Sequence, residues 1–444
     1  MRVLFFPSDK GGGFGHISRC LALAEELTRR GGEVAFVLRG PHAGRVAAAG
    51  WTVFRPPRLS LPAHLRQWLK AALDRFQPGP AYFFFSDLNF QVVRDGFHTP
   101  KAMQQAVEWD LDVVNRFRPD VLVGDVWLLT SIVGRLAKLP VVQIVRSALH
   151  PACPQLVWWR SLPSQIRSPD VAPIFNPILE QWGLPPIKQA NDLLDGDLLL
   201  VPSIPALDPL PPNAERTHYV GPLVRSALWQ AQGTALGGRC MPDWLAALPR
   251  DRPVVYVTVG GGSDSVRGLD LLPLWDATFA GTDWEIVVST GGRAVGRRWR
   301  RRGNLRVFPW VPGAAMVARA DGVLFHGGYG TMMETVRAGM PSVVLPFHTE
   351  QESNGRRLQQ SGAARVLAPA DDDLEPVKGR WGGGEFTSLV CRRLAFHPHQ
   401  VREAVSSILH DDLYRSSAAR LRCSQAAYSG VILAVDLLTD LGIF

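Results

Sequence analysis

The sequence predicts an α/β protein with two Rossmann-like domains, each built on a doubly wound parallel sheet, facing each other across a cleft. Three observations predict this fold. Short apolar runs alternate with amphipathic runs in both halves of the chain. Glycine-rich turns join several of these runs, as expected where a strand leads into a helix. The length of 444 residues exceeds one compact core and fits two domains of about 200 residues each.

The first predicted unit opens the chain. An apolar run over residues 3–7 is followed by a glycine loop over 10–16 and an amphipathic segment over 18–30. A further apolar run at 34–38 begins the next strand. Strand, loop, helix and strand in this order indicate a parallel sheet, in which ligands bind at the carboxyl ends of the strands.

His16 closes the glycine loop and so lies at such a strand end. A histidine has an ordinary pKa of about 6.5, which makes it suited to take a proton from a hydroxyl near neutral pH. The alternative is that His16 only caps the following helix. We expect it to be a general base.

Asp125 ends another apolar run, residues 121–124, and is the expected partner of His16. A carboxylate within hydrogen-bond reach of one ring nitrogen would fix the tautomer and stabilise the imidazolium. Asp120, before the run, is typical of a turn. Asp125 as an acceptor for backbone N–H groups stays open as an alternative, and Asp9 is the other carboxylate near His16.

The predicted domain boundary lies at mid-chain, where prolines crowd residues 202–222. We expect an acceptor-binding domain over 1–215 and a donor-binding domain over 216–424. The amphipathic end, 425–444, is expected to cross back as a helix onto the first domain.

A second series of strands begins after the linker. Residues 254–259 and 285–288 are apolar runs, and the loop from Gly260 to Ser263 between them is expected to line a diphosphate. Residues 322–325 form a later strand that ends at glycines and enters a helix over 331–338. Such a helix start offers N–H groups and a positive dipole end to an anion.

Side chains around this turn suit a nucleotide-sugar. His326 and Thr331 can donate to a phosphate, and Glu334, one turn into the helix, can accept from ribose hydroxyls. Glu350 and Gln351 follow the strand over 342–346, and their side-chain oxygens can accept hydrogen bonds from sugar hydroxyls. The alternative is that the glycines serve close packing without a ligand.

Together these residues resemble the donor-site signature of family 1 glycosyltransferases, which have the GT-B fold and use UDP- or dTDP-sugars. The likeness implies that His16 is the catalytic base oriented by Asp125, and that Trp310 stacks on the nucleotide base. The remaining donor positions it implies are His326, Gly328, Gly330, Thr331, Glu334, Glu350, Gln351 and Asn354, with Ser263 on the opposite loop. Resemblance is strongest over 250–365 and around His16.

Three positions depart from plant members of that family. Gly313 replaces a glutamine beside the base, and Tyr329 replaces a tryptophan. Both leave the choice between UDP and dTDP open. Glu350 replaces the commoner aspartate, which leaves the sugar open.

The acceptor side is predicted from aromatic residues in segments that interrupt strand–helix alternation, 60–110 and 150–186. An apolar small molecule or lipid would suit such a surface. The expected contacts are Phe84, Phe85, Phe90, Trp127 and Trp158. For each of them, packing in the domain's own core is the alternative. Residues 371–396 are expected to be an inserted loop or hairpin.

The net charge and the cysteines limit the possible binding partners and disulfides further. The net charge is +8, and part of the excess lies in the cluster from Arg293 to Arg302. This cluster is either a solvated face or a contact with an anionic membrane surface, and nothing around it indicates nucleic-acid binding. The five scattered cysteines form no C-x-x-C pair, so we expect free thiols. No apolar stretch of 18 residues or signal-peptide pattern occurs, so we expect a cytoplasmic protein.

We therefore predict an inverting, metal-independent glycosyltransferase without a cofactor, whose partners are a nucleotide-sugar and an apolar acceptor. Asp371, Asp372 and Asp373 are expected in a loop rather than as a metal handle. The first alternative is a nucleotide-sugar hydrolase, which residues 13–21 also resemble. The second is a non-catalytic nucleotide-sugar-binding protein. No feature of the sequence indicates an oligomeric state.

Overall fold

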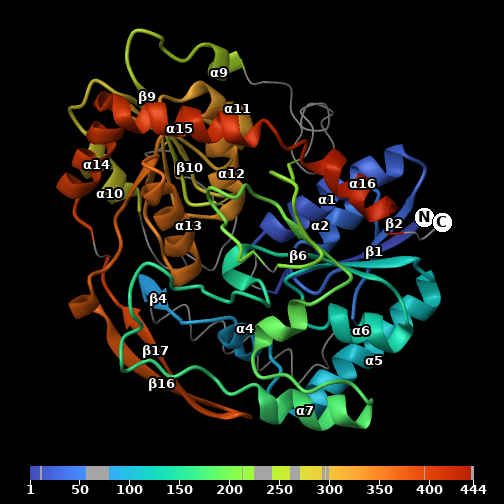
Figure 1. Ribbon diagram of the computed structural model, residues 1–444. Helices are drawn as coiled ribbons and strands as arrows, with labels where there is room; N and C mark the ends of the chain where they lie inside the picture. The colour runs from blue at the N-terminus through green and yellow to red at the C-terminus, as the bar shows by residue number, and fades with distance from the viewer. Residues whose placement is uncertain are drawn as a thin grey trace.

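The computed structural model contains two parallel sheets, each flanked by helices (Figure 1). It describes residues 1–10, 13–56, 80–212, 214–224, 243–260, 271–292, 296, 300–394 and 396–441. The predicted α/β fold with two Rossmann-like halves is confirmed. Ser263 and Arg293 lie outside the described residues.

The first sheet has seven parallel strands in the order β3-β2-β1-β5-β6-β7-β8. Their bounds are β1 Arg2–Pro7, β2 Glu33–Val37, β3 Thr52–Phe54, β5 Val121–Asp125, β6 Val141–Ile144, β7 Leu198–Val201 and β8 Thr217–Tyr219. The helices of this half are α1 Gly15–Arg29, α2 Ala43–Ala48, α4 Asn89–Arg94, α5 Pro100–Phe117, α6 Thr130–Ala137 and α7 Ala172–Gln181. The chain winds outward in both directions from β1, so the crevice beyond β1 and β5 is the topological switch point.

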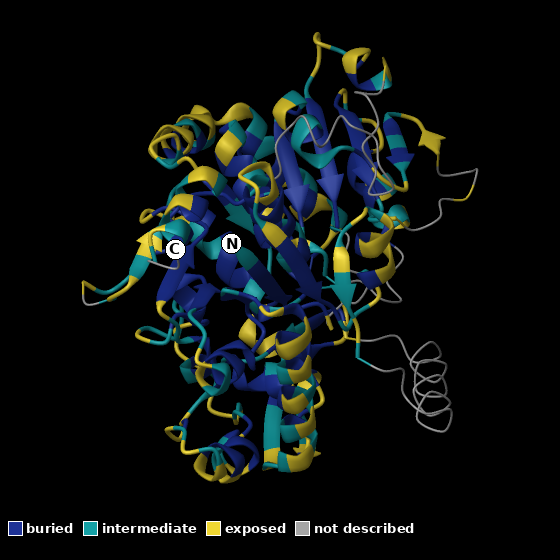
Figure 2. Cartoon of the chain, turned by 90° about the vertical axis from the view of Figure 1, so that its right-hand side faces the viewer, coloured by how far each residue is buried: buried dark blue, intermediate teal, exposed yellow. Residues whose placement is uncertain are grey.

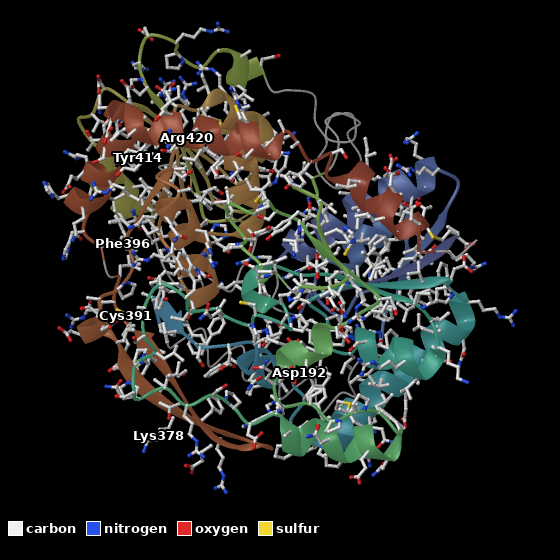
Figure 3. All side chains as sticks on the ribbon, in the orientation of Figure 1. Asp192, Lys378, Cys391, Phe396, Tyr414 and Arg420 are labelled. Atoms are coloured by element: carbon white, nitrogen blue, oxygen red, sulfur yellow. The ribbon has the colours of Figure 1, made fainter. Side chains whose placement is uncertain are left out.

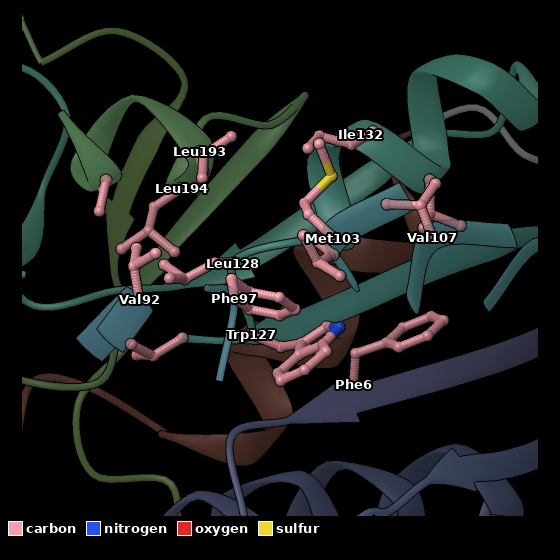
Figure 4. Close-up of a cluster of buried hydrophobic side chains, with 14 of the residues drawn as sticks. Phe6, Val92, Phe97, Met103, Val107, Trp127, Leu128, Ile132, Leu193 and Leu194 are labelled. Carbon is pink, nitrogen blue, oxygen red and sulfur yellow. The ribbon is translucent and has the colours of Figure 1, made fainter. Parts of the chain in front are cut away.

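Both faces of this sheet are buried because its strands are apolar at almost every position. Phe5 packs on one side with residues of α1, and Phe6 packs on the other with Trp127 and Phe97 (Figure 4). The register pairs Pro7 with Asp125, so both strands end at the same edge. The side chains that follow these strands therefore meet at one crevice.

The second sheet has the order β11-β12-β10-β9-β13-β14-β15, with only β11 antiparallel. Its strands are β9 Val254–Thr258, β10 Glu285–Ser289, β11 Arg301–Arg302, β12 Leu305–Phe308, β13 Gly322–Phe325, β14 Ser342–Val344 and β15 Ala364–Val366. Its helices are α9 Asp243–Ala246, α10 Leu272–Phe279, α11 Gly313–Arg319, α12 Tyr329–Ala338, α13 Thr349–Gln360, α14 Pro398–His410 and α15 Asp412–Gln425. The switch point lies between β9 and β13.

The last helix, α16 Val431–Thr439, lies against α1 of the first half (Figure 1). Ala434, Val435 and Leu438 are buried in the cluster that contains the α1 side chains. Arg30 of α1 also pairs with Asp436 at 2.6 Å. The end of the chain thus ties the second half to the first.

A third sheet joins segments from both halves. The hairpin of β16 Glu375–Trp381 and β17 Gly384–Cys391 pairs antiparallel with β4 Tyr82–Phe84. The predicted insertion over 371–396 thus contains this hairpin, over 375–391, and Asp371–Asp373 form a short 3-10 turn before it. Buried residues concentrate along the parallel strands, and exposed ones along the outer helices and the hairpin (Figure 2). Among the described residues, no helix is long and apolar enough to cross a bilayer.

Candidate active site

His16 and Asp125 meet at the switch point of the first sheet. His16 is the second residue of α1, and Asp125 is the last residue of β5. The imidazole Nδ1 lies 2.7 Å from Asp125 Oδ1, and the aspartate side chain is fully buried while the histidine is partly exposed. The expected contact is present, and the other ring nitrogen, Nε2, is left to act on a substrate.

Arg19 is a third member of this cluster that the sequence analysis missed. Its Nε donates to Asp125 Oδ2 at 2.9 Å, and one terminal nitrogen donates to Oδ1 at 2.8 Å. The same nitrogen lies 2.9 Å from His16 Nδ1. Since Nδ1 cannot both donate to the aspartate and accept from the arginine, the closer, charged aspartate indicates an N–H at Nδ1. The spacing of three residues on one helix face was the available signal.

The opposite charges of Asp125 and Arg19 stabilise each other. Burial acts to raise the pKa of Asp125, but the Arg19 guanidinium and His16 outweigh it and lower that pKa. Burial likewise opposes the charge on Arg19, and Asp125 overcomes it and raises the pKa of the guanidinium. Asp125 therefore stays ionised beside His16.

Asp9, the other carboxylate considered as a partner of His16, serves the backbone instead. It accepts from the N–H groups of Arg39, at 2.9 Å, and of Gly40, at 2.6 Å. The loop before His16 is open, because a Cβ added at Gly13 or Gly15 would meet no described atom within 4 Å.

His326 lies at the corresponding position of the second sheet, directly after β13. A Cβ on either Gly260 or Gly328 would collide with its ring, so both glycines are required by the packing around the imidazole. Burial, assisted by His348, lowers the pKa of His326 to about 4. Its Nδ1 has no hydrogen-bond partner among the described residues. A neutral ring with an unused nitrogen suits a phosphate oxygen.

The start of α12 follows two residues later. Gly328 is the N-cap and gives no side-chain cap, and the first helical bond runs from Met332 N–H to Gly328 C=O. The N–H groups of Gly330 and Thr331 thus precede the helical ladder. A Cβ at Gly330 would meet nothing within 4 Å, so protein packing does not require a glycine there. The open space fits an anion at the helix start.

Glu334 lies near the start of α11, which Trp310 precedes by three residues. Burial raises the pKa of Glu334 to about 7. A Cβ at Gly313, the first residue of α11, would lie 3.2 Å from Glu334 Oε2, so this glycine keeps the approach to the carboxylate open. Trp310 is 49% exposed, which is unusual for an indole and leaves a face for stacking.

Three predicted donor-site residues follow β14, and Glu350 among them contacts the other half. Gln351 is buried, and its Oε1 accepts from Phe347 N–H at 2.8 Å. Asn354 is also buried and donates from Nδ2 to Gly327 C=O at 2.7 Å. These two amides thus hold the turns on which the site is built. Glu350 pairs with Arg146 of the first half at 3.1 Å.

Residues of the two halves lie together around Tyr329. The guanidinium of Arg146 lies 4.7 Å from the ring centre of Tyr329, and that of Arg19 lies 5.5 Å from it. Burial acts to raise the pKa of Glu350, but Arg146, His348 and His16 lower it. His16 of the first half is therefore close enough to act electrostatically on the sugar-side carboxylate of the second half.

Tyr329, which replaces a tryptophan of plant members, lies where the two halves meet. It is buried, and its hydroxyl donates to Pro202 C=O, 3.0 Å away in the segment between β7 and β8 of the first half. Tyr329 and Arg146 thus fix how the halves meet. Neither role has a local sequence signal, because each contact joins distant segments.

The predicted acceptor residues fall into two groups. Trp127 is 1% exposed, packs in the first core and donates from its indole N–H to Asp110 at 3.1 Å (Figure 4). Phe84 is fully buried as well. Both therefore follow the core alternative, because β4 and the strand end at β5 are covered on both faces. Phe85 and Trp158 keep partly exposed rings, and Phe90 is buried in contact with Phe85.

The comparisons with known proteins agree with this arrangement. Residues 276–380 match the family model described as erythromycin biosynthesis protein CIII-like, C-terminal domain. A PGL/p-HBAD biosynthesis glycosyltransferase of Mycobacterium tuberculosis is 27% identical over 322 residues, 67% of this chain and 71% of that protein. The 4'-demethylrebeccamycin synthase of Lentzea aerocolonigenes is 26% identical over 97% of both chains.

Among solved structures, the spinosyn rhamnosyltransferase SpnG superposes with a TM-score of 0.67 at 21% identity, covering 99% of this chain and 100% of that one. Structures of that rhamnosyltransferase also exist with thymidine diphosphate and with spinosyn aglycone. At this identity the likeness shows the fold alone. The similarity to glycosyltransferases rests on the two proteins compared by sequence, the PGL/p-HBAD biosynthesis glycosyltransferase and the 4'-demethylrebeccamycin synthase.

Proposed function

We propose that this chain is a family 1 glycosyltransferase of the natural-product and lipid type, and that it transfers a sugar with inversion to a hydroxyl of a largely apolar acceptor. His16 is the general base. The observation that carries the proposal is the 2.7 Å contact between His16 Nδ1 and the buried Asp125, in a crevice that also holds Glu350. Nε2 is then the nitrogen that faces substrate.

The reaction proceeds in one displacement. The acceptor oxygen attacks the anomeric carbon as its proton passes to His16 Nε2, and the bond from that carbon to the diphosphate oxygen breaks. The nucleoside diphosphate leaves with the electron pair. Asp125 stabilises the imidazolium, and attack from the face opposite the leaving group inverts the configuration.

The donor is a UDP- or dTDP-sugar held by the second half. The N–H groups at the start of α12 and the neutral His326 stabilise the diphosphate, which gains charge as the bond breaks. Glu334 accepts from the ribose hydroxyls, Trp310 stacks on the base, and Glu350 accepts from the sugar. The thymidine diphosphate bound by the spinosyn rhamnosyltransferase supports a thymine nucleotide.

Each half of the protein binds one of the two substrates. The first half binds the acceptor and the second half binds the donor, with 425–444 returning to the first half. Because β8 Thr217–Tyr219 belongs to the first sheet, the expected boundary after residue 215 falls within the first half. The partly exposed rings of Phe85 and Trp158 support an apolar acceptor. They also favour transfer over the hydrolase alternative, since water needs no aromatic surface.

The test compares His16→Ala and Asp125→Asn with the wild type, using dTDP- and UDP-sugars and a panel of phenols. We expect kcat to fall roughly 100- to 10,000-fold in His16→Ala, with thymidine diphosphate binding unchanged in a thermal-shift assay. Asp125→Asn should retain binding as well but lose kcat, because the amide does not stabilise the imidazolium. NMR of the product should show the anomeric configuration opposite to the donor's. A His16→Ala enzyme with nearly full kcat would remove His16 from the mechanism.

A further inference from the structure

The β16–β17 hairpin is held against the first half at several points. β17 pairs with β4 through Leu389, Val390 and Cys391. Thr387 exchanges two backbone hydrogen bonds with Arg167, of 3.0 and 2.9 Å. The placement of the hairpin is therefore defined by both halves.

Its two ends are also fixed. At the base, Asp371 pairs with Arg160 of the first half. At the turn, a Cβ on Gly382 would collide with the carbonyl of His98, so the hairpin backbone lies directly on the first half. A hairpin fixed at base, edge and turn can hold a side chain rigidly toward the crevice.

Phe386 of β17 ends a row of rings that begins beside the sugar-side carboxylate. His348, two residues before Glu350, has its ring centre 5.9 Å from that of Phe85. Phe85 is 6.0 Å from Phe90, and Phe90 is 5.8 Å from Phe386. The row thus consists of three ring–ring contacts and extends from His348, two residues before Glu350, to Phe386 on the hairpin.

The hairpin has a glycine that positions Phe386. Gly379 of β16 pairs with Phe386 in the register, and a Cβ on Gly379 would collide with the phenyl ring. Gly379 is not among the glycines with positive φ, so the backbone conformation does not demand it. The glycine is required for space, because the ring of Phe386 lies across its neighbouring strand.

The two outer rings of the row remain partly open. Phe85 and Phe386 are partly exposed and pack against the first hydrophobic cluster, while Phe90, which contacts both rings, is buried. Adjacent half-open rings of this kind stabilise an apolar or aromatic ligand by burying its surface.

We propose that Phe386 is a specificity-determining residue, and that the β16–β17 hairpin of the donor half completes the acceptor site. This inference rests on the proposed function. The acceptor is an elongated apolar molecule with its reacting hydroxyl at one end, near His16, and its far part against Phe386. The hairpin therefore selects acceptors by length.

The test measures kcat/KM for phenol and for 4-alkylphenols of increasing chain length, with one fixed nucleotide-sugar. The kcat/KM of the wild type should rise with the length of the alkyl chain until that chain reaches the hairpin. Phe386→Ala should lose about 10- to 100-fold in kcat/KM for the long acceptors, chiefly through KM, and stay unchanged with phenol. Gly379→Ala, which displaces the ring without removing it, should give a smaller loss of the same kind.

Lys378→Ala is the matched control, because Lys378 lies on the same hairpin and points into solvent (Figure 3). It should match the wild type with every acceptor. Thymidine diphosphate binding and the melting temperature of Phe386→Ala show whether the variant is folded. If kcat/KM depends on acceptor chain length equally in the wild type and in folded Phe386→Ala, the inference is overturned and the proposed function stays intact. Absence of transfer by the wild type to any acceptor would contradict the proposed function itself.

Discussion

Replacing Gly330 by alanine separates ligand binding from protein packing. Gly330 lies in the first turn of α12 with open space where its Cβ would be, and its φ is not among the positive values. Alanine costs less backbone entropy on folding than glycine, so the variant should gain about 0.5–1 kcal/mol of stability. For a domain of this size that corresponds to a rise in melting temperature of roughly 1–4 °C.

The same methyl group would occupy the space assigned to the diphosphate. We expect thymidine diphosphate to bind at least about 10-fold more weakly, a loss of about 1.4 kcal/mol, despite the gain in stability. Isothermal titration measures the affinity and differential scanning calorimetry the melting temperature. Gly328→Ala is the contrasting variant, because its Cβ collides with His326 and should lower both stability and binding. A Gly330→Ala protein that binds as tightly as the wild type would refute an anion site at this helix start.

Two further predictions use the charges of the crevice. Burial raises the pKa of Glu334 from 4.5 to about 7, so the folded state holds this proton more tightly than the unfolded state. The wild type therefore loses stability as pH rises from about 4.5 through 7. Glu334→Gln should match the wild-type melting temperature near pH 4.5 and exceed it at pH 8, and equal values at pH 8 would contradict the assigned pKa. The Arg146–Glu350 pair joins the two halves at 3.1 Å. A double-mutant cycle of Arg146→Met and Glu350→Gln in urea denaturation should give a coupling of about 0.5–1 kcal/mol, whereas additive effects would show that the pair does not stabilise the contact between the halves.

The sequence by itself determined the repeated strand–turn–helix units and the positions of His16, Asp125 and His326 at strand ends. These features are local, since periodicity and a glycine turn are readable within a dozen residues. Parallel strands place their carboxyl ends at one edge, so the fold class predicted that His16 and Asp125, 109 positions apart, lie at the same edge, and only the structure gives the 2.7 Å distance between them.

Only the tertiary structure decided the contacts between the halves. Tyr82 donates to Glu352 across 270 positions, and β4 pairs with a hairpin from the far end of the chain. Such pairings depend on how two separately folded layers meet, and no local pattern encodes that geometry. For the same reason Trp127 is a core residue, Arg146 is an inter-half contact and Gln351 holds a backbone turn, although their residue types suited other roles equally well.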